Sequence, residues 1–177
     1  MKKLIVIEGF DRTGKDTLLK DLYNINLPNT YIYFNDLEDL PDYNDQDDFL
    51  EWLNKFIVTQ INMINELFED YDNIIMTRFI ITDEVYSTLF DREHTVLKYL
   101  EDLRDDIEIY NYCLLFKDYD EYLKRLKIIK DDDVQYSKED FDKINNLYKE
   151  ILNDYNSYIE YITADTSREF ILKSFLN

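Results

Sequence analysis

Glycine, proline and cysteine are all scarce in this chain. Of its 177 residues, two are glycine, two are proline and one is cysteine. A single cysteine, Cys113, excludes an internal disulfide framework, and its apolar neighbours Leu114 and Leu115 predict a buried thiol in a strand. The chain also lacks an apolar run long enough to cross a bilayer and the layout of a signal peptide. We therefore expect a soluble, cytoplasmic protein that does not act at a membrane.

Positive charge is scarce as well. The chain has 20 lysines and arginines against 39 acidic residues, which gives a formal net charge of −19. A surface this acidic repels a polyanion, which argues against a nucleic-acid partner because affinity for nucleic acid depends on Lys and Arg neutralising phosphates. A single nucleotide in a local basic pocket remains compatible with this charge. The length fits one domain, 1–177, with a substantial core.

The two glycines, Gly9 and Gly14, stand five positions apart near the start of the chain. The apolar run 4–7 precedes them, and a segment with helical character begins at Asp16. Glycine tolerates positive φ angles and the close approach of other atoms. The spacing Gly-x-x-x-x-Gly-Lys between a strand and a helix is that of a phosphate-binding loop. In such a loop the backbone N–H groups and the helix N-terminus bind an anion, and Lys15 reaches the outer phosphates.

Short apolar segments alternate with segments of helical periodicity along the rest of the chain. The alternation predicts a three-layer α/β fold, in which a five-stranded parallel sheet carries helices on both faces. Because ligands bind beyond the carboxyl ends of the strands in such sheets, residues just after each strand are the site candidates. We expect strands at 4–7, 31–34, 73–76, 110–116 and 159–162, and helices at 16–23, 49–71, 80–90, 95–103, 119–127, 141–155 and 169–176.

The segment Glu8-Gly9-Phe10-Asp11-Arg12-Thr13-Gly14-Lys15 resembles the opening of the thymidylate kinases, within the deoxynucleoside monophosphate kinases. The resemblance implies a P-loop kinase fold with a small lid at about 127–136, ATP as phosphoryl donor and Mg²⁺ as cofactor. It implies a homodimer too, for which the apolar helix 49–71 is the candidate interface. It assigns the acceptor sugar to Asp11 and the charge of the transferred phosphoryl group to Arg12. The phosphate-binding residues would be Gly9, Asp11, Thr13, Gly14, Lys15, Asp16 and Thr17.

The segment Thr77-Arg78-Phe79-Ile80-Ile81-Thr82-Asp83-Glu84-Val85-Tyr86 resembles the family sequence Asp-Arg-Tyr-x-x-Ser-x-x-Ala-Tyr. By this resemblance Arg78 grips the acceptor phosphate, a task that suits a guanidinium group. Phe79 would lie in the acceptor site, and Tyr86 against the deoxyribose, where its ring would exclude a 2′-hydroxyl. A surface ion pair is the alternative explanation for Arg78, and a core position on an amphipathic helix is the alternative for Tyr86.

Two positions depart from the family pattern. Thr77 stands where the family has an acid, and Asp16, followed by Thr17, stands where the loop usually has Ser or Thr. In phosphate-loop enzymes these positions lie near the magnesium ion, which prefers oxygen ligands. Our hypothesis is that Asp16 supplies the carboxylate near Mg²⁺. The alternative is that Asp16 is an acid in the first helical turn, where the helix dipole favours it.

The acceptor base is left open by the sequence. Phe49 and Trp52 lie on the helix with which the family covers this base, so we take them as acceptor-binding candidates, although aromatic residues at helical spacing also fit a core. The family reads the base with an arginine on this helix, but no arginine occurs between Arg12 and Arg78, and Lys55 is the only cation nearby.

Three cations in the second half of the chain would face the donor. The resemblance places Arg125 near the donor adenine, and Lys127 and Lys130 on the lid that closes over the phosphates. A solvated face of mixed charge is the alternative for the two lysines. The segment 164–167 follows the last strand, where the family backbone meets the adenine. The lid contains no arginine, which agrees with Arg12 acting from within the phosphate loop.

The resemblance predicts Mg²⁺-assisted, in-line transfer of the γ-phosphoryl group of ATP to a deoxynucleoside monophosphate, with dTMP as the expected acceptor. The nearest alternative is a deoxynucleoside kinase, which needs a carboxylate base after the second strand, where the chain has Asn35, Asp36 and, further on, Glu38. A nucleotide-binding protein with a degenerate catalytic site is the third hypothesis, suggested by the two departures. The predicted catalytic residues are Arg12, Lys15 and Arg78.

Overall fold

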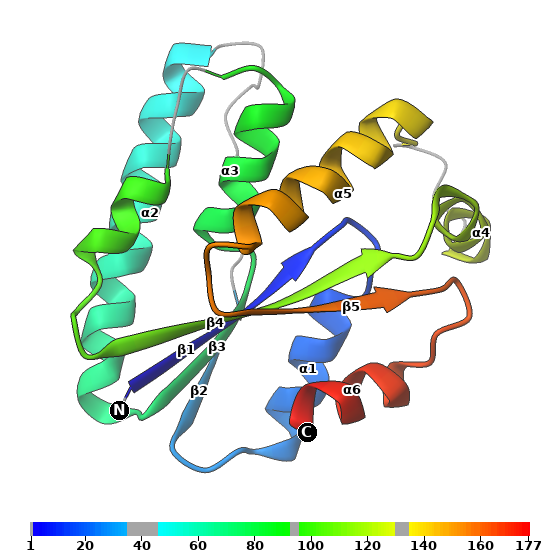
Figure 1. The fold of residues 1–177 in the computed structure, drawn as a ribbon. Coiled ribbons are helices and arrows are strands. Elements are labelled where there is room, and N and C mark those ends of the chain that lie inside the picture. Colours follow the sequence, from blue (N-terminus) through cyan, green and yellow to red (C-terminus); the bar gives the residue numbers. More distant parts are fainter. Residues whose placement is uncertain (1, 35–45, 93–95, 130–134) are drawn as a thin grey trace.

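The computed structural model describes residues 2–34, 46–92, 96–129 and 135–177. Strands and helices alternate along these ranges (Figure 1). The strands are β1 (Lys2–Gly9), β2 (Thr30–Tyr33), β3 (Asn73–Thr77), β4 (Ile107–Phe116) and β5 (Ser157–Ile162). The helices are α1 (Lys15–Ile25), α2 (Gln46–Asp70), α3 (Ile80–Leu89), the 3-10 helix η1 (Leu97–Asp102), α4 (Tyr119–Ile129), α5 (Lys138–Leu152) and α6 (Arg168–Leu176).

The five strands form one sheet in the order β2-β3-β1-β4-β5, and all neighbouring pairs are parallel. Helices α1 and α6 lie on one side of this sheet, and α2, α3 and α5 lie on the other (Figure 1). The three-layer α/β fold that the sequence predicts is therefore confirmed. After β1 the chain adds β2 and β3 on one side of it and then β4 and β5 on the other. The strand order thus reverses at β1, and ligands in such sheets bind at the carboxyl ends of the strands beside this point.

The strands at the centre of the sheet bury both of their faces. Leu4 and Val6 of β1 pack against α2, whereas Ile5 and Ile7, which point the opposite way, pack with α1. This burial explains why the sequence of β1 is apolar without alternation. Cys113 of β4 is fully buried, as expected from its apolar neighbours.

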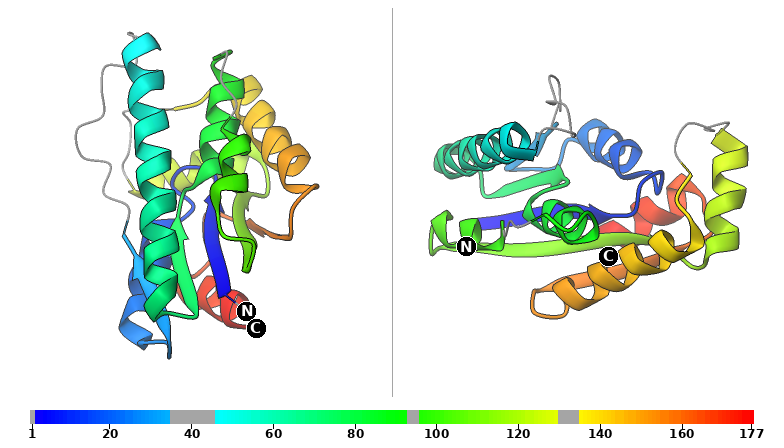
Figure 2. Two further views of the ribbon diagram at one scale, coloured as in Figure 1. Left: turned by 90° about the vertical axis from the view of Figure 1, so that its left-hand side faces the viewer. Right: turned by 90° about the horizontal axis from the view of Figure 1, so that it is seen from above.

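Helix α2 (Gln46–Asp70) runs along most of the height of the molecule (Figure 2, left). Its helical spacing of apolar residues is confirmed, because the stripe that faces the sheet is almost entirely buried. Within the residues described, no helix is both long enough and apolar enough to cross a membrane. The buried residues of the stripe are Phe49, Leu53, Ile57, Ile61, Ile64 and Phe68.

Several predicted boundaries shift by a few residues. Strand β4 starts at Ile107 instead of residue 110, because its first residues pair with β1, and backbone pairing leaves no mark in the apolar pattern. Helix α5 covers Lys138–Leu152 rather than 141–155, since Ser137 caps it by accepting a hydrogen bond from the Asp140 N–H at 3.1 Å. The helix expected at 95–103 is the short 3-10 helix η1, and residues 93–95 lie outside the described part.

Candidate active site

The two glycines of the phosphate loop serve different purposes. Gly9 ends β1 with φ at 123°, and a Cβ atom at this position would overlap the carbonyl oxygen of Leu114 in β4. Gly14 precedes α1 with φ at 93°, in the left-handed region that glycine enters without strain, and open space surrounds it. Gly9 therefore allows the loop to leave a packed sheet, and Gly14 turns the chain into the helix.

Lys15 is buried inside the loop. Its ammonium group donates hydrogen bonds to the carbonyl oxygens of Gly9 at 2.9 Å and of Phe10 at 2.6 Å. Thr13 is buried too, and its hydroxyl donates to the same Phe10 carbonyl at 2.7 Å, whereas Thr17 is exposed on the first turn of α1. The pKa of Lys15 is lowered from 10.5 to about 8. Burial is the largest cause, and the nearby positive charge of Arg78 is the next.

Both predicted catalytic arginines have unusual backbone conformations. Arg12 in the loop has φ at 65°, and Arg78, directly after β3, has φ at 50°. The left-handed region costs a non-glycine residue about 1–3 kcal/mol, and such strain clusters at functional sites. The N–H of Arg78 donates to the carbonyl oxygen of Ile7 in β1 at 3.1 Å, so strand pairing continues into the strained residue. The positive charge of Arg12 acts on Tyr122 in α4. Burial raises the pKa of Tyr122, and the charge of Arg12 opposes this rise.

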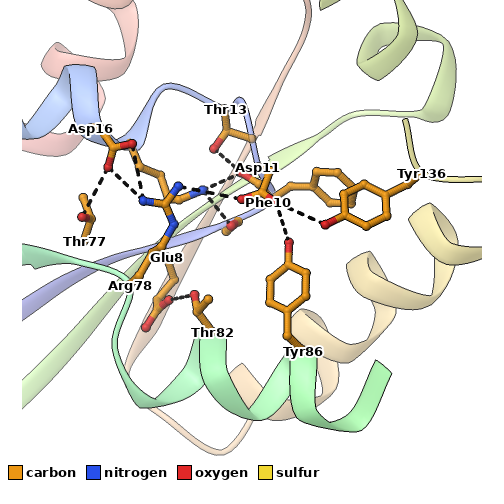
Figure 3. Close-up of polar contacts among 12 residues, drawn as sticks. Glu8, Phe10, Asp11, Thr13, Asp16, Thr77, Arg78, Thr82, Tyr86 and Tyr136 are labelled. Carbon is orange, nitrogen blue, oxygen red and sulfur yellow. Dashed lines mark hydrogen bonds and ion pairs between the residues drawn. The ribbon is translucent and has the colours of Figure 1, made fainter. Parts of the chain in front are cut away.

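Arg78 joins the end of β3 to the phosphate loop (Figure 3). Its guanidinium Nη1 lies 3.1 Å from Oδ1 of Asp16, and its Nη2 lies 3.8 Å from Oδ1 of Asp11. The hydroxyl of Thr77 donates to the same Asp16 oxygen at 3.4 Å. The two departures from the family pattern, at Asp16 and Thr77, are thus in direct contact.

Asp11 accepts hydrogen bonds from two tyrosines (Figure 3). The hydroxyls of Tyr86, from α3, and Tyr136, from the segment before α5, each lie 3.2 Å from its Oδ2. Burial and, after it, the negative charge of Asp11 raise the pKa of both phenols. The pKa of Tyr136 is raised to about 12. Both phenols therefore stay protonated and act as donors that fix the carboxylate. The sequence pointed to Tyr86 only; Tyr136, at the end of the proposed lid, gave no signal of this contact.

The three other acceptor candidates have different surroundings. Phe79 is buried against α2 in the core. Phe49 is also buried, yet the guanidinium carbon of Arg92 lies only 4.4 Å from its ring centre. Trp52 is half-buried and stacks on Phe56, with ring centres 5.0 Å apart. Of the aromatic candidates on α2, Phe49 is thus the one that meets a cation.

A cavity of about 200 Å³ lies beside the phosphate loop, at the carboxyl end of β5. Arg125 reaches it from α4, and the Nε atom of this arginine is buried with no hydrogen-bond partner in the described structure. Arg168, also on its wall, bonds to the carboxylate of Asp21 in α1. Gly14 also lines the cavity, and the polar residues of the wall are Thr13, Thr17, Arg125, Thr163, Thr166 and Arg168.

Some of the candidate residues lie outside the described ranges. These are Asn35, Asp36 and Glu38, which we considered for a base, and Lys130 with most of the lid expected at 127–136. Lys127 is described and lies exposed near the end of α4. Nothing in the structure therefore tests the lid.

Comparisons with known proteins bear on the fold. No family model and no curated protein sequence matches the chain.

Solved structures do match the chain over nearly its whole length. Deoxyadenosine kinase from M. mycoides, with the products dCMP and dCDP bound, has a TM-score of 0.61 and 15% identity, covering 98% of this chain and 97% of its own. Thymidylate kinase from Candida albicans has a TM-score of 0.65 and 16% identity, with coverage of 99% and 89%. Thymidylate kinase from Ehrlichia chaffeensis has a TM-score of 0.54 and 14% identity, with coverage of 99% and 98%.

The chain has the P-loop fold of the thymidylate and deoxynucleoside kinases. The resemblance read from the loop is confirmed at the level of the fold.

Glu8 is a central residue of this candidate site that the sequence analysis did not identify. It is fully buried, its Oε1 accepts from the N–H of Phe79 at 3.2 Å, and its Oε2 accepts from the hydroxyl of Thr82. The Thr82 oxygen lies 3.0 Å from the hydroxyl of Tyr148 in α5, which in turn donates to the Gly9 carbonyl at 3.1 Å. Burial raises the pKa of Glu8 to about 7. An acid at the end of a continuous apolar strand was the available signal.

Asp83 and Arg92 were missed for a different reason. The pKa of Asp83 is raised to about 8. Burial is the largest cause, the negative charge of Glu8 adds to it, and the positive charge of Arg92 opposes it. Arg92 follows the end of α3, and its distance along the sequence from α2 hides its contact with Phe49. Only the packing of the kinase-like fold brings these groups to one side of the cleft.

Proposed function

We propose that this chain transfers the γ-phosphoryl group of ATP to a deoxynucleoside monophosphate, and that dTMP, converted to dTDP, is the preferred acceptor. The observation that carries the proposal is the convergence of two cationic centres on one pair of carboxylates. Arg78, at the end of β3, pairs with Asp11 and Asp16, and both carboxylates and Arg78 act on the charge of Lys15 in the phosphate loop. Two neighbouring cationic centres of this kind fit a reaction that joins two phosphates.

The donor would bind in the phosphate loop and the cavity beside it. The N-terminus of α1 and the backbone of the loop suit the polyphosphate. The cavity of about 200 Å³ offers Arg125, whose buried Nε has no hydrogen-bond partner in the described part of the chain. A buried unpaired donor is costly and is expected to acquire a partner from a ligand. Arg125 at the base of ATP would remove this cost.

Magnesium, when bound with ATP, would neutralise part of the charge of its phosphates. The described residues contain no group of three acidic or other metal-ligating side chains. One carboxylate with hydroxyls and phosphates is, however, the kind of donor set that Mg²⁺ uses beside nucleotides. Asp16 with the hydroxyls of Thr17 and Thr77 provides it here, so these residues would hold the ion.

The remaining groups would position the reactants. Arg78 would bind the acceptor phosphate, so that one of its oxygens attacks the γ-phosphorus as the bond to ADP breaks. Arg12 would neutralise charge on the phosphoryl group in transit, supported by its strained position in the loop. Asp11, fixed by Tyr86 and Tyr136, would accept a hydrogen bond from the sugar 3′-hydroxyl.

A deoxynucleoside kinase is the second candidate, because one of the similar structures is a deoxyadenosine kinase. Such an enzyme needs a carboxylate that removes a proton from the nucleoside 5′-hydroxyl. Glu8 does not suit this task, because it is fully buried and both of its oxygens already accept hydrogen bonds. Arg78, in contrast, suits an acceptor that already carries a phosphate. This favours the monophosphate.

An ATP-consumption assay tests the proposal directly. The purified chain, with Mg²⁺ and ATP, is supplied in turn with dTMP, dUMP, dGMP, dCMP, dAMP or thymidine, and each product is identified by chromatography. We expect a diphosphate from dTMP and no product from thymidine. Lys15→Ala should abolish turnover, whereas Lys20→Ala, an exposed lysine of the same helix, should not. Product from thymidine alone would favour the second candidate, and ATP binding without any product would favour a degenerate site.

We further propose that the chain forms a homodimer through α2. Val58 on this helix is 42% exposed, and two-fold pairing is the commonest oligomeric arrangement. Light scattering coupled to size-exclusion chromatography checks this. A mass of one chain, 21.7 kDa, at working concentration would contradict it.

A further inference from the structure

Two carboxylates beside the phosphate loop hold the guanidinium of Arg78 (Figure 3). Its Nη1 lies 3.1 Å from Oδ1 and 3.4 Å from Oδ2 of Asp16, and its Nη2 lies 3.8 Å from Oδ1 of Asp11. Both terminal nitrogens of the guanidinium thus face an acid. A guanidinium binds a phosphate best through two parallel N–H···O bonds. A phosphate that is bound in this way by Arg78 therefore has to displace at least one of the two carboxylates.

The two carboxylates are held with unequal firmness. Asp11 accepts hydrogen bonds from two tyrosine hydroxyls, each 3.2 Å from its Oδ2, and its side chain is 25% exposed. The side chain of Asp16 is 61% exposed. Within the described part of the chain, its only partner besides Arg78 is the hydroxyl of Thr77, at 3.4 Å. Because an exposed ion pair contributes little to stability, Asp16 is the carboxylate that gives way.

The release of Asp16 changes the charge on the donor side. Asp16 is the second residue of α1, in the helical turn that would face the phosphates of ATP. While it pairs with Arg78, its negative charge is neutralised. Once Arg78 turns to another anion, the free carboxylate becomes an oxygen ligand of the kind that Mg²⁺ prefers, whereas it repels phosphates that carry no metal. The same movement therefore favours a nucleotide with Mg²⁺ and disfavours one without it.

We propose that Arg78 exchanges Asp16 for the phosphate of the acceptor, and that the Asp16 released in this exchange tightens the binding of ATP with Mg²⁺. This inference rests on the proposed function and adds to it a coupling between the two substrates. The coupling depends on the two departures from the family pattern, because Asp16 places the acid on α1 within reach of Arg78 and Thr77 leaves the strand end uncharged. Linkage makes the effect mutual, so the donor also tightens the acceptor by the same factor.

Titration calorimetry measures this coupling without turnover. The titrant is the β,γ-imido analogue of ATP, which cannot pass on its γ-phosphoryl group, and its Kd is measured with and without saturating dTMP, or the monophosphate that the consumption assay shows to be preferred. With Mg²⁺, the monophosphate should lower this Kd by about 3–5-fold, which corresponds to the contribution of one exposed ion pair. Thymidine should leave the Kd unchanged because it has no phosphate. With EDTA in place of Mg²⁺, the monophosphate should raise the Kd, since the freed carboxylate then repels the nucleotide.

Three variants assign the effect to one carboxylate. Asp16→Asn removes the charge and should abolish the tightening, whereas Asp16→Glu keeps the charge and should retain it. Asp120→Asn is the matched control, because Asp120 is also an exposed acid in the first turn of a helix, α4, and makes no printed contact with Arg78. It should show the coupling of the unmodified chain.

The outcomes separate this inference from the proposed function. If the monophosphate binds but its effect on the Kd is the same in Asp16→Asn as in the unmodified chain, the inference is wrong and the proposed function stands. The same holds if thymidine tightens the analogue as strongly as the monophosphate does, or if the tightening persists in EDTA. If no monophosphate binds or is phosphorylated, the proposed function falls and this inference falls with it.

Discussion

The two sides of the candidate cleft are built from different parts of the polypeptide. The phosphate-binding part of the proposed donor side is mainly backbone: a strand, a loop with two glycines and the first turn of α1, all within residues 2–17. The acceptor side is made of side chains from β3, α3 and the start of α2, which packing brings together. A backbone site is encoded by spacing within one segment, whereas a side-chain site depends on the whole fold. The acceptor side is therefore where function can change without a change of fold.

Replacing Arg78 by alanine tests whether the sides are separable, and it has the largest expected effect. If Arg78 serves the acceptor, kcat/KM for the monophosphate should fall by about 10²–10³-fold, as for other preorganised charges in active sites. The KM for ATP should change by only a few-fold. Steady-state kinetics with each substrate varied in turn measures both values.

Arg104→Ala is the control, because this arginine makes exposed ion pairs with Asp106 and Glu69 away from the cleft. An equal loss for both substrates in Arg78→Ala would mean that its contact with Asp16 serves the donor as well. The comparison between the two sides would then break down at this residue.

Glu8 lies beneath both sides, and its titration should appear in stability. Burial raises its pKa from 4.5 to about 7, so the folded chain keeps the proton while the unfolded chain releases it. The contribution to stability is full below pH 4.5 and is lost as the pH rises to about 7, by on the order of 3 kcal/mol. Glu8→Gln should remove this part of the loss and leave the part that comes from Asp83, whose pKa burial also raises, to about 8. Urea unfolding between pH 4.5 and 7.5 measures it, with Glu101→Gln, at an exposed acid, as the control. The same downward slope in Glu8→Gln and in the unmodified chain would contradict the assignment.

Replacing Arg125 by alanine tests the donor side alone, with a smaller effect. Loss of one contact to the base of ATP should raise the KM for ATP by about 10-fold, equivalent to about 1.4 kcal/mol, and leave the acceptor KM unchanged. Lys124→Ala, at the exposed neighbour paired with Glu121, should change neither value. An altered acceptor KM with an unaltered ATP KM would mean that the cavity beside β5 does not hold the donor.

The sequence predicted the sheet, the helices and the phosphate loop because each is a local pattern. Gly9, Gly14 and Lys15 are informative through spacing alone, and Arg78 through its place after a strand. Thr77 and Asp16 were recognised as two departures from the family pattern. Only the structure shows that the Thr77 hydroxyl lies 3.4 Å from Oδ1 of Asp16.

The missed residues are those whose role depends on distant segments. Tyr136 reaches Asp11 across 125 positions of sequence, and Tyr148 reaches Gly9 across 139. Arg92 meets Phe49 only because α2 starts and α3 ends at the same end of the molecule (Figure 1). Such contacts follow from tertiary packing, and no periodicity or spacing within one segment encodes them. The roles of the individual site residues stay predictions.

Asp11 is the place where the two sides touch, and a double-mutant cycle on its tyrosines measures how rigid that junction must be. Tyr86→Phe and Tyr136→Phe each remove one hydroxyl that lies 3.2 Å from the same carboxylate oxygen. Either change alone should lower kcat/KM by only a few-fold, because the remaining tyrosine still fixes the carboxylate. The double variant should lose more than the product of the two single effects, since partners of one group are not additive. Strict additivity would mean that the tyrosines act independently, through packing rather than through Asp11, and would remove the physical link between the donor and acceptor sides.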